Sequence, residues 1–387
     1  MSIILNELDP LLIGLCDLES DYSNLMRTNK HYQDLISRNN LFMEWKIYRS
    51  KHKYEFKEKE KSLIYACSLG LLLFSKYLVK KYVIDIHYSK EKAFVMSCEN
   101  GHINMAMWLF DLSNQPGYTL IDIHDEYEYA FRVSCGKGHL NIAKWLIELS
   151  RQSSKLIDIH VIDEYAFRYS CETSHLNVAQ WLIDLSREPG FSLIDIHACN
   201  DAAFNWSCLK GRVNVAEWLI DLSKQPGFTL IDIHARNENA FVLSCREGHI
   251  NMAQWLFDLS RGVEIRDANL QSNLPFQEQG KKPRFTLIDI HAGNEDAFRL
   301  ACKEGHINVA KWLIELSKSN EAGFRLINIH AQNDYAFVET CTQLRMSKAH
   351  IDTAKWLIEL GKQQEFTPIP EDIIAIYSNI INPKKLN

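Results

Sequence analysis

A single motif recurs along most of this chain of 387 residues. Most copies carry an Ala-Phe pair, a Cys, a Gly-His pair, a Trp-Leu pair and finally Ile-Asp-Ile-His. The first four steps between tryptophans measure 37, 36, 37 and 37 residues, counted over Trp108, Trp145, Trp181, Trp218, Trp255, Trp312 and Trp356. A period in this range predicts stacked repeats, in which each unit buries its apolar face against its neighbours. Such a protein works by presenting a surface to something that it binds.

The residues 129–160 illustrate one copy of the motif. Phe131 and Cys135 lie four residues apart, on one face of a predicted first helix. A second helix is predicted where apolar residues recur at helical spacing, at Leu140, Ala143, Leu146 and Leu149. The segment 157–160, Ile-Asp-Ile-His, then predicts a short extended finger that leads into a polar turn. The unit is therefore helix, turn, helix and finger, and alignment on the cysteines gives about eight such units.

Two segments of the motif resemble a known family. Residues 248–256, Gly-His-Ile-Asn-Met-Ala-Gln-Trp-Leu, are similar to the second helix of the ankyrin repeat, and residues 232–237, Asp-Ile-His-Ala-Arg-Asn, to its finger. Ala-Phe replaces the family's Thr-Pro-Leu-His opening, and each unit is about four residues longer. The Trp-rich form looks like the ankyrin proteins expanded in giant DNA viruses of amoebae. The resemblance implies an all-α ankyrin-repeat solenoid.

The predicted array covers residues 62–365 and is flanked by two other segments. Residues 1–55 predict a helical N-terminal module, and residues 366–387 predict a C-terminal capping helix and a tail. Inside the array, residues 261–284 form a polar insertion without helical periodicity, which lengthens one tryptophan step to 57 residues. The role of this insertion is left open by its composition.

The N-terminal module weakly resembles an F-box, a small helical domain that docks ubiquitin-ligase adaptors. Thr and Asn at 28 and 29 replace the family's Val-Cys, and the usual leading Leu-Pro is absent. The resemblance implies adaptor docking through the matching residues, which are Leu25, Lys30, Tyr32, Leu35 and Phe42. The alternative is a helical cap that shields the first repeat unit from solvent.

The repeat spacing limits whether the cysteines can form disulfides and whether the histidines can form a metal site. Eight of the ten cysteines fall one per unit, at Cys67, Cys98, Cys135, Cys171, Cys208, Cys245, Cys302 and Cys341. Equivalent residues of packed helices lie about 8–10 Å apart, whereas a disulfide needs Cα atoms within about 7 Å. The cysteines are therefore predicted to be buried thiols in a reducing compartment. The same spacing keeps the repeated histidines from forming a zinc site.

Catalytic signatures are missing from the sequence, which has no His-Glu-x-x-His, no P-loop, no Gly-x-Ser-x-Gly and no Cys-x-x-Cys. An active site needs different groups that converge, whereas a repeated motif supplies identical groups far apart. We therefore expect no enzyme activity, no catalytic residues, no metal and no cofactor. Each histidine is expected to hold a turn of its own unit.

The net charge and the hydropathy of the chain limit the kinds of partner that we expect it to bind. The net charge is −6 and no basic block dominates, which argues against a nucleic-acid partner. No apolar run approaches the roughly 20 residues of a spanning helix, and the N-terminus lacks a signal-peptide pattern. The sequence thus predicts an intracellular, cytoplasmic protein without membrane contact, in the host cytoplasm if the chain is viral. We expect a monomer that binds one or more proteins.

The variable positions of the repeat are the candidates for binding. Positions that stay the same between units are expected to hold the scaffold, whereas the residues after each Phe and at each finger tip differ. In ankyrin proteins these elements line the concave face, which the resemblance implies is the partner site. Arginine and aromatic side chains concentrate interface energy, so the leading candidates are Arg132, Arg168, Tyr169, Trp206 and Arg236. The alternative for each is that it covers a neighbouring helix.

Two functions follow from these predictions. The first is a non-catalytic scaffold that binds a host or viral protein on the concave face. The alternative is a substrate receptor of an SCF-type ubiquitin ligase, in which the N-terminal module docks the adaptor and the array holds the substrate.

Overall fold

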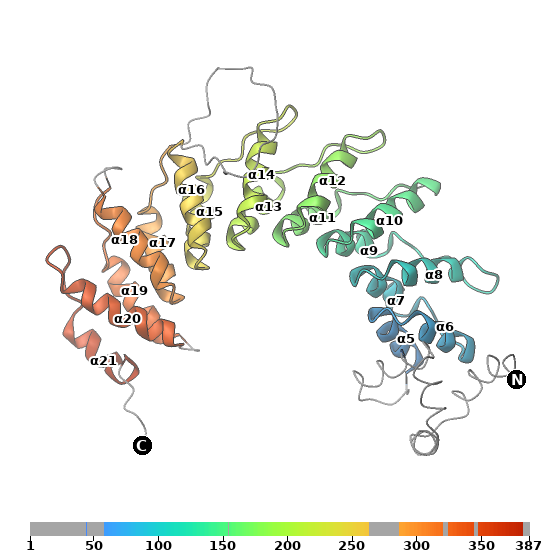
Figure 1. Ribbon diagram of the computed structural model, residues 1–387, viewed down its shortest axis with the longest axis horizontal. Coiled ribbons are helices and arrows are strands. Elements are labelled where there is room, and N and C mark those ends of the chain that lie inside the picture. The colour runs from blue at the N-terminus through green and yellow to red at the C-terminus, as the bar shows by residue number, and fades with distance from the viewer. Residues whose placement is uncertain are drawn as a thin grey trace, which may run out of the picture. The chain divides into compact units, whose positions relative to one another are not determined.

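The computed structural model describes residue 44 and residues 58–153, 155–262, 286–319, 324–343 and 347–381. These residues form helices α5 to α21, and no β-strand occurs among them (Figure 1). The predicted all-α helical-repeat fold is therefore confirmed.

Sixteen of these helices form eight consecutive pairs, one pair per repeat unit. The first helices are α5 (Lys59–Ser68), α7 (Tyr88–Glu99), α9 (Asp125–Gly136), α11 (Val161–Glu172), α13 (Ala198–Leu209), α15 (Ala235–Arg246), α17 (Ala292–Lys303) and α19 (Ala331–Thr342). The second helices are α6 (Leu72–Lys81), α8 (Ile103–Ser113), α10 (Leu140–Gln152), α12 (Leu176–Ser186), α14 (Val213–Ser223), α16 (Ile250–Ser260), α18 (Ile307–Lys318) and α20 (Lys348–Gly361). Helix α21 (Glu371–Ile381) follows the last pair.

The chain divides into two compact units. The first comprises Met1–Ser170 and His175–Ile194, and the second comprises Cys171–Ser174 and Asp195–Asn387. The first compact unit therefore contains α5 to α10, α12 and most of α11, and the second contains α13 to α21.

Seven of the eight first helices bury the Phe of the Ala-Phe pair and the Cys four residues later, and in α5 the buried Leu63 takes the place of the Phe. The phenylalanines are at most 1% exposed, namely Phe94, Phe131, Phe167, Phe204, Phe241, Phe298 and Phe337. All eight repeat cysteines are buried free thiols, as predicted. Burial raises the pKa of Cys67 to about 12 and that of Cys341 to about 11, so both stay protonated at neutral pH.

The repeated tryptophans join one repeat unit to the one before it. The ring of Trp145 lies 6.2 Å from that of Phe94 and meets Phe110 edge-on at 6.0 Å. In the same way, the ring of Trp312 lies 6.1 Å from that of Phe241 in the repeat unit before it. Most of the tryptophans are half-buried rather than enclosed. Their packing role is therefore mainly at the contact between units, where aromatic pairs add to the burial of apolar area.

The Gly-His pair between the two helices makes a second contact between units. Gly101 has a φ of +80°, and a Cβ atom there would lie 2.6 Å from Cε1 of His139 in the next unit. Nε2 of His139 also lies 3.0 Å from the carbonyl oxygen of Glu99. Glycine is thus required both by the left-handed backbone and by the imidazole that rests on it.

Candidate functional site

A histidine ends each finger and pairs with a carboxylate four residues later. Nδ1 of His124 lies 2.9 Å from Oε2 of Glu128, and the backbone N–H of His124 donates to Oδ1 of Asp122 at 2.8 Å. The other pairs are His87–Glu91, His160–Glu164, His197–Asp201, His234–Glu238, His291–Glu295 and His330–Asp334. Sequence reasoning missed these acids, although the His-x-x-x-Glu/Asp spacing was present in every finger.

The same groups connect successive fingers. Nε2 of His87 lies 2.9 Å from Oγ1 of Thr119, and Oε1 of Glu91 accepts the backbone N–H of Asp122 at 3.4 Å. Burial raises the pKa of Glu91, and its hydrogen bond with His87 opposes this rise. The histidines and acids are thereby occupied by the scaffold and its turns.

The finger tip contains three successive residues with left-handed backbone. At the finger tip that begins α9 these are Glu126, Tyr127 and Glu128, with φ of 51°, 58° and 60°. Left-handed backbone costs about 1–2 kcal/mol for each residue other than glycine. The guanidinium of Arg132 holds this turn, because its Nε donates to the carbonyl oxygen of Tyr127 at 2.7 Å and its Nη2 to that of Glu126 at 2.9 Å.

Arg168 makes the equivalent pair of hydrogen bonds, to the carbonyl oxygens of Asp163 at 2.6 Å and Ile162 at 2.9 Å. Arg132 and Arg168 are each only 6% exposed. We predicted that the residue after Phe plays no part in holding the scaffold together. That prediction is wrong for these two arginines, because both hold a turn of their own repeat unit. Their guanidinium groups face inward because the strained turn offers carbonyl oxygens that need donors.

A row of aromatic and cationic side chains crosses the first helices of the first compact unit. Arg132 lies between two tyrosines, with its Cζ 5.2 Å from the ring centre of Tyr129 and 5.1 Å from that of Tyr165. Arg168 lies 5.9 Å from the ring centre of Tyr165, whose ring is 5.5 Å from that of Tyr169. We call these five residues the Tyr–Arg row. Each cation–π contact contributes about 0.5–2 kcal/mol, depending on its desolvation.

The structure thus brings together three of the predicted residues, Arg132, Arg168 and Tyr169, through two tyrosines that were not predicted. Tyr129 and Tyr165 both precede an Ala-Phe pair. This position varies between units, as Lys92, Tyr129, Tyr165, Ala202, Asn239, Asp296 and Tyr335. Tyr129 and Tyr165 could therefore have been predicted from the variation at this position.

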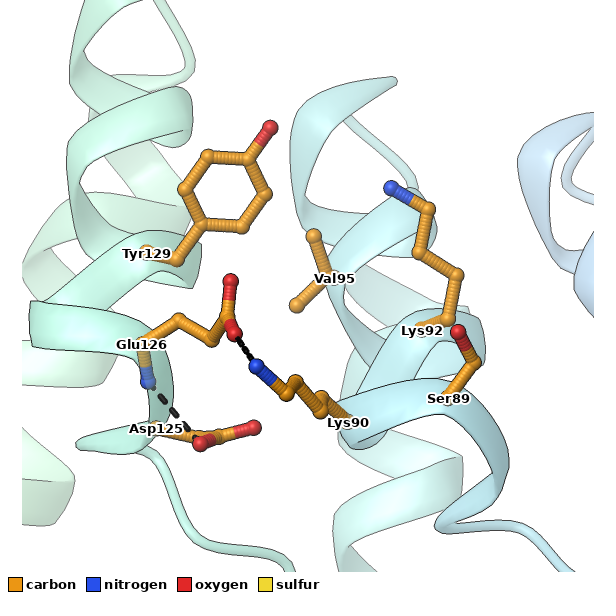
Figure 2. A pocket seen from close by; sticks show the side chains of 7 residues that line it. All are labelled: Ser89, Lys90, Lys92, Val95, Asp125, Glu126 and Tyr129. Atoms are coloured by element: carbon orange, nitrogen blue, oxygen red, sulfur yellow. Dashed lines mark hydrogen bonds and ion pairs between the residues drawn. The ribbon is translucent and has the colours of Figure 1, made fainter.

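An open pocket of about 320 Å³ lies beside the Tyr–Arg row, between α7 and α9 (Figure 2). Its lining consists of Ser89, Lys90, Lys92, Val95, Asp125, Glu126 and Tyr129. Lys90 reaches across from α7 and pairs with Glu126 of α9, and this carboxylate raises the pKa of Lys90. The pocket therefore carries charges of both signs against one aromatic wall.

Large apolar side chains are exposed at the finger tips next to the Tyr–Arg row. Tyr127 is 74% exposed and Ile162 is 46% exposed, and both belong to the left-handed turns that Arg132 and Arg168 hold. The two remaining predicted residues lie in the second compact unit. There Trp206 is half-buried on α13, and Arg236 is exposed at the finger tip that begins α15.

The predicted adaptor-docking residues lie outside the described residues, as does most of the insertion predicted at 261–284. These docking residues are Leu25, Lys30, Tyr32, Leu35 and Phe42. Close to them in sequence, Glu44 is described, and its Oε2 accepts the backbone N–H of Phe74 at 2.8 Å, in the first turn of α6. Burial raises the pKa of Glu44, while hydrogen bonds from Phe74 and Leu73 oppose the rise.

Within the described ranges, no group of three or more His, Cys, Asp and Glu residues is arranged to hold a metal ion. Among the same residues, no helix has the length and apolar character that crossing a bilayer requires.

Comparisons with known proteins add little to this picture. No protein-family model matches the chain, and no curated protein matches it. Among solved structures, an ankyrin repeat family protein from Legionella pneumophila is similar, with 17% sequence identity and a TM-score of 0.28. The similarity covers 79% of this chain and 90% of that one.

Proposed function

We propose that the chain is a non-catalytic ankyrin-repeat scaffold that binds a protein, host or viral, through the fingers and first helices of its first compact unit. This is the face that the ankyrin resemblance implies is concave. The observation that carries the proposal is the exposure of Tyr127 and Ile162 on turns that Arg132 and Arg168 hold in place.

Rigid aromatic and aliphatic side chains suit a binding surface because little conformational entropy is lost when a partner covers them. The left-handed turn fixes the backbone of Tyr127, and the two hydrogen bonds of Arg132 fix the turn. In this proposal Arg132 and Arg168 act as positioning residues. The direct contacts are Tyr127 and Ile162 at the tips, together with the half-buried Tyr169.

The test is affinity purification of the full chain from expressing cells, with mass spectrometry of the captured proteins. We expect the double variant Tyr127→Ser/Ile162→Ser to lose partners that the unaltered chain captures. Ile376→Ser is the matched control, because Ile376 is 70% exposed on α21 and belongs to neither finger. If the double variant and the control capture the same proteins as the unaltered chain, the proposed surface is wrong.

Trp206 and Arg236 remain candidates for contacts in the second compact unit. The variants Trp206→Ala and Arg236→Glu test them in the same purification. A partner that these two changes release, and that Tyr127→Ser/Ile162→Ser retains, would place the binding surface in the second compact unit instead. Arg168→Glu is unsuitable for this purpose, because it would break the turn at Ile162.

The alternative function, a substrate receptor of an SCF-type ligase, rests on the sequence resemblance of residues 1–50. The contact of Glu44 with the first turn of α6 favours the capping role for this segment. A deletion would remove that contact, so point changes are the better test. Loss of an adaptor–cullin complex from the Tyr32→Asp/Leu35→Asp variant would support the receptor function, and no adaptor captured by the unaltered chain would exclude it.

A further inference from the structure

A hydroxyl, an imidazole and a carboxylate are joined by hydrogen bonds in the first compact unit. Oγ of Ser192 lies 2.9 Å from Nε2 of His160, and Nδ1 of the same ring lies 2.7 Å from Oε1 of Glu164. Ser192 comes from the segment that leads into the next finger, 32 residues after His160. A nucleophile within hydrogen-bond reach of a base, which a third group orients in turn, is the arrangement that activates a serine hydroxyl.

The carboxylate of Glu164 decides which nitrogen of His160 carries the proton. An ionised carboxylate only accepts hydrogen bonds, so the proton of the neutral imidazole is on Nδ1 and is donated to Glu164. Nε2 then has a free lone pair, and the hydroxyl of Ser192 is the donor in the second hydrogen bond. The hydroxyl proton of Ser192 is therefore directed at a base that can take it.

The hydroxyl is open to solvent, whereas the groups that support it are more enclosed. Ser192 is exposed, while the side chains of His160 and Glu164 are 28% and 7% exposed. The backbone N–H of His160 also donates to Oδ1 of Asp158 at 2.9 Å, which holds the main chain of the base. A reagent can therefore reach Oγ of Ser192 while the base keeps its orientation.

Serine distinguishes this site from the equivalent contacts of other units, where the hydroxyl belongs to Thr119, Thr229 and Thr286. The branched Cβ of threonine places a methyl group beside Oγ1, which crowds the approach of another carbon atom. At Thr229 the imidazole also has a competing partner, because Nε2 of His197 lies 3.0 Å from the carbonyl oxygen of Thr229. That contact requires a proton on Nε2, so His197 is not a base there.

We propose that Ser192 is a modification site that accepts an acyl group from an activated ester or thioester, with His160 as the general base and Glu164 as a positioning residue. Oγ of Ser192 attacks the carbonyl carbon, and its proton passes to Nε2 of His160. The bond between Oγ and this carbon forms, the bond from the carbon to the leaving oxygen or sulfur breaks, and the leaving group takes the proton from Nε2. The product is an ester at Ser192. This inference does not rest on the proposed function, because the acyl donor is a small molecule and needs no protein partner.

The probe is para-nitrophenyl acetate, added to the full chain, and peptide mass spectrometry measures the rate of acetylation at each serine. Ser192 should be acetylated about a hundred times faster than Ser378, since a positioned general base contributes about 10²–10⁴-fold. Ser378 is the matched reference, because it is exposed but its hydroxyl donates to the carbonyl oxygen of Ala375 at 2.9 Å instead of to a base.

Variants of the base and of the hydroxyl locate the reaction. His160→Gln should lower the rate at Ser192 to that at Ser378. Thr119→Ser should create a second serine that is acetylated about a hundred times faster than Ser378. Oγ1 of Thr119 already lies 2.9 Å from Nε2 of His87, whose Nδ1 lies 2.7 Å from a carboxylate oxygen of Glu91.

Variants of Glu164 test its positioning role. Glu164→Ala should slow acetylation of Ser192 about tenfold or more, because the imidazole is no longer held in one tautomer. Glu164→Asp should restore the rate, since Asp201 fills the same repeat position and reaches Nδ1 of His197 at 2.5 Å. A purely structural role of Glu164 would leave the ratio between the rates at Ser192 and Ser378 unchanged.

The proposal is overturned if Ser192 and Ser378 are acetylated at the same rate in the unaltered chain, or if His160→Gln retains its helical circular dichroism and the fast reaction. If His160→Gln unfolds the chain, Thr119→Ser decides the question, because it removes only a methyl group from an exposed side chain. A fast reaction at the new serine supports the proposal, and a rate equal to that at Ser378 contradicts it.

Discussion

The carboxylate of Glu128 joins two fingers at once. Its Oε2 lies 2.9 Å from Nδ1 of His124 in its own unit, and its Oε1 accepts the backbone N–H of Asp158 in the next finger at 3.4 Å. Glu128 is only 3% exposed, so water cannot replace either partner. A buried carboxylate is stable here because both of its oxygens have partners.

Glu128→Ala should therefore destabilise the first compact unit by about 1.5–3 kcal/mol, since two hydrogen bonds to a charged group are lost. Glu128→Asp is the matched control. Asp201 fills the same repeat position and reaches Nδ1 of His197 at 2.5 Å, so the shorter acid is compatible with the pair. Urea unfolding followed by circular dichroism measures both changes. Equal losses for alanine and aspartate would contradict this role of the carboxylate.

Gly101→Ala should destabilise the chain more than Gly117→Ala. Both glycines have a positive φ, of +80° and +97°, so alanine is strained at either position. Only at Gly101 does the new Cβ meet another side chain, the ring of His139 at 2.6 Å, whereas nothing lies within 4 Å at Gly117. The difference between the two urea midpoints thus isolates the contact with His139. Equal midpoints would show that the imidazole moves away at no cost.

Arg132→Val should free the finger tip without unfolding the helices. Val95 and Val242 fill the equivalent position in other units, so valine is compatible with the fold there. The loss of two guanidinium hydrogen bonds should cost about 1.5–3 kcal/mol. Hydrogen exchange of the amides of residues 126–128 should accelerate, while that of α10 stays unchanged. Unchanged exchange at the tip would contradict the assignment of Arg132 as the group that holds the turn.

Acid should destabilise the contacts of the Gly-His pairs. Burial lowers the pKa of His139 and of His306 below the ordinary value of 6.5. The unfolded chain then binds more protons between that value and the folded pKa, so stability is present above pH 6.5 and is lost as the pH falls below it. His139→Gln/His306→Gln should lose less stability than the unaltered chain between pH of about 7.5 and 5.5. The same loss in both proteins would exclude these two histidines as its source.

The repeat could be predicted from the sequence because it depends on local periodicity. Phe131 and Cys135 lie four residues apart, which is enough to place them on one buried helical face. The predicted array of helix pairs with buried thiols is therefore confirmed. The helical fold does not decide the viral resemblance or the F-box resemblance, and both stay predictions.

The surface could be predicted only in part. The sequence marked the position after Phe as variable, and Arg132 and Arg168 were interpreted as partner contacts. In the structure the same variation reflects whether a turn is held by a guanidinium or left to a valine, as at Val95. Variation between repeat units therefore marks freedom from the common core, which is not the same as exposure to a partner.

By itself the sequence determined the period, the helix pair and the buried thiols, since each follows from residue spacing along the chain. Only the tertiary structure decided which side chains face outward. The left-handed finger tip turns Arg132 inward and leaves Tyr127 exposed, and the alternation of the finger leaves Leu120 and Asp122 on its outer face. These directions depend on backbone dihedral angles and on carbonyl groups from other residues, which residue spacing does not encode.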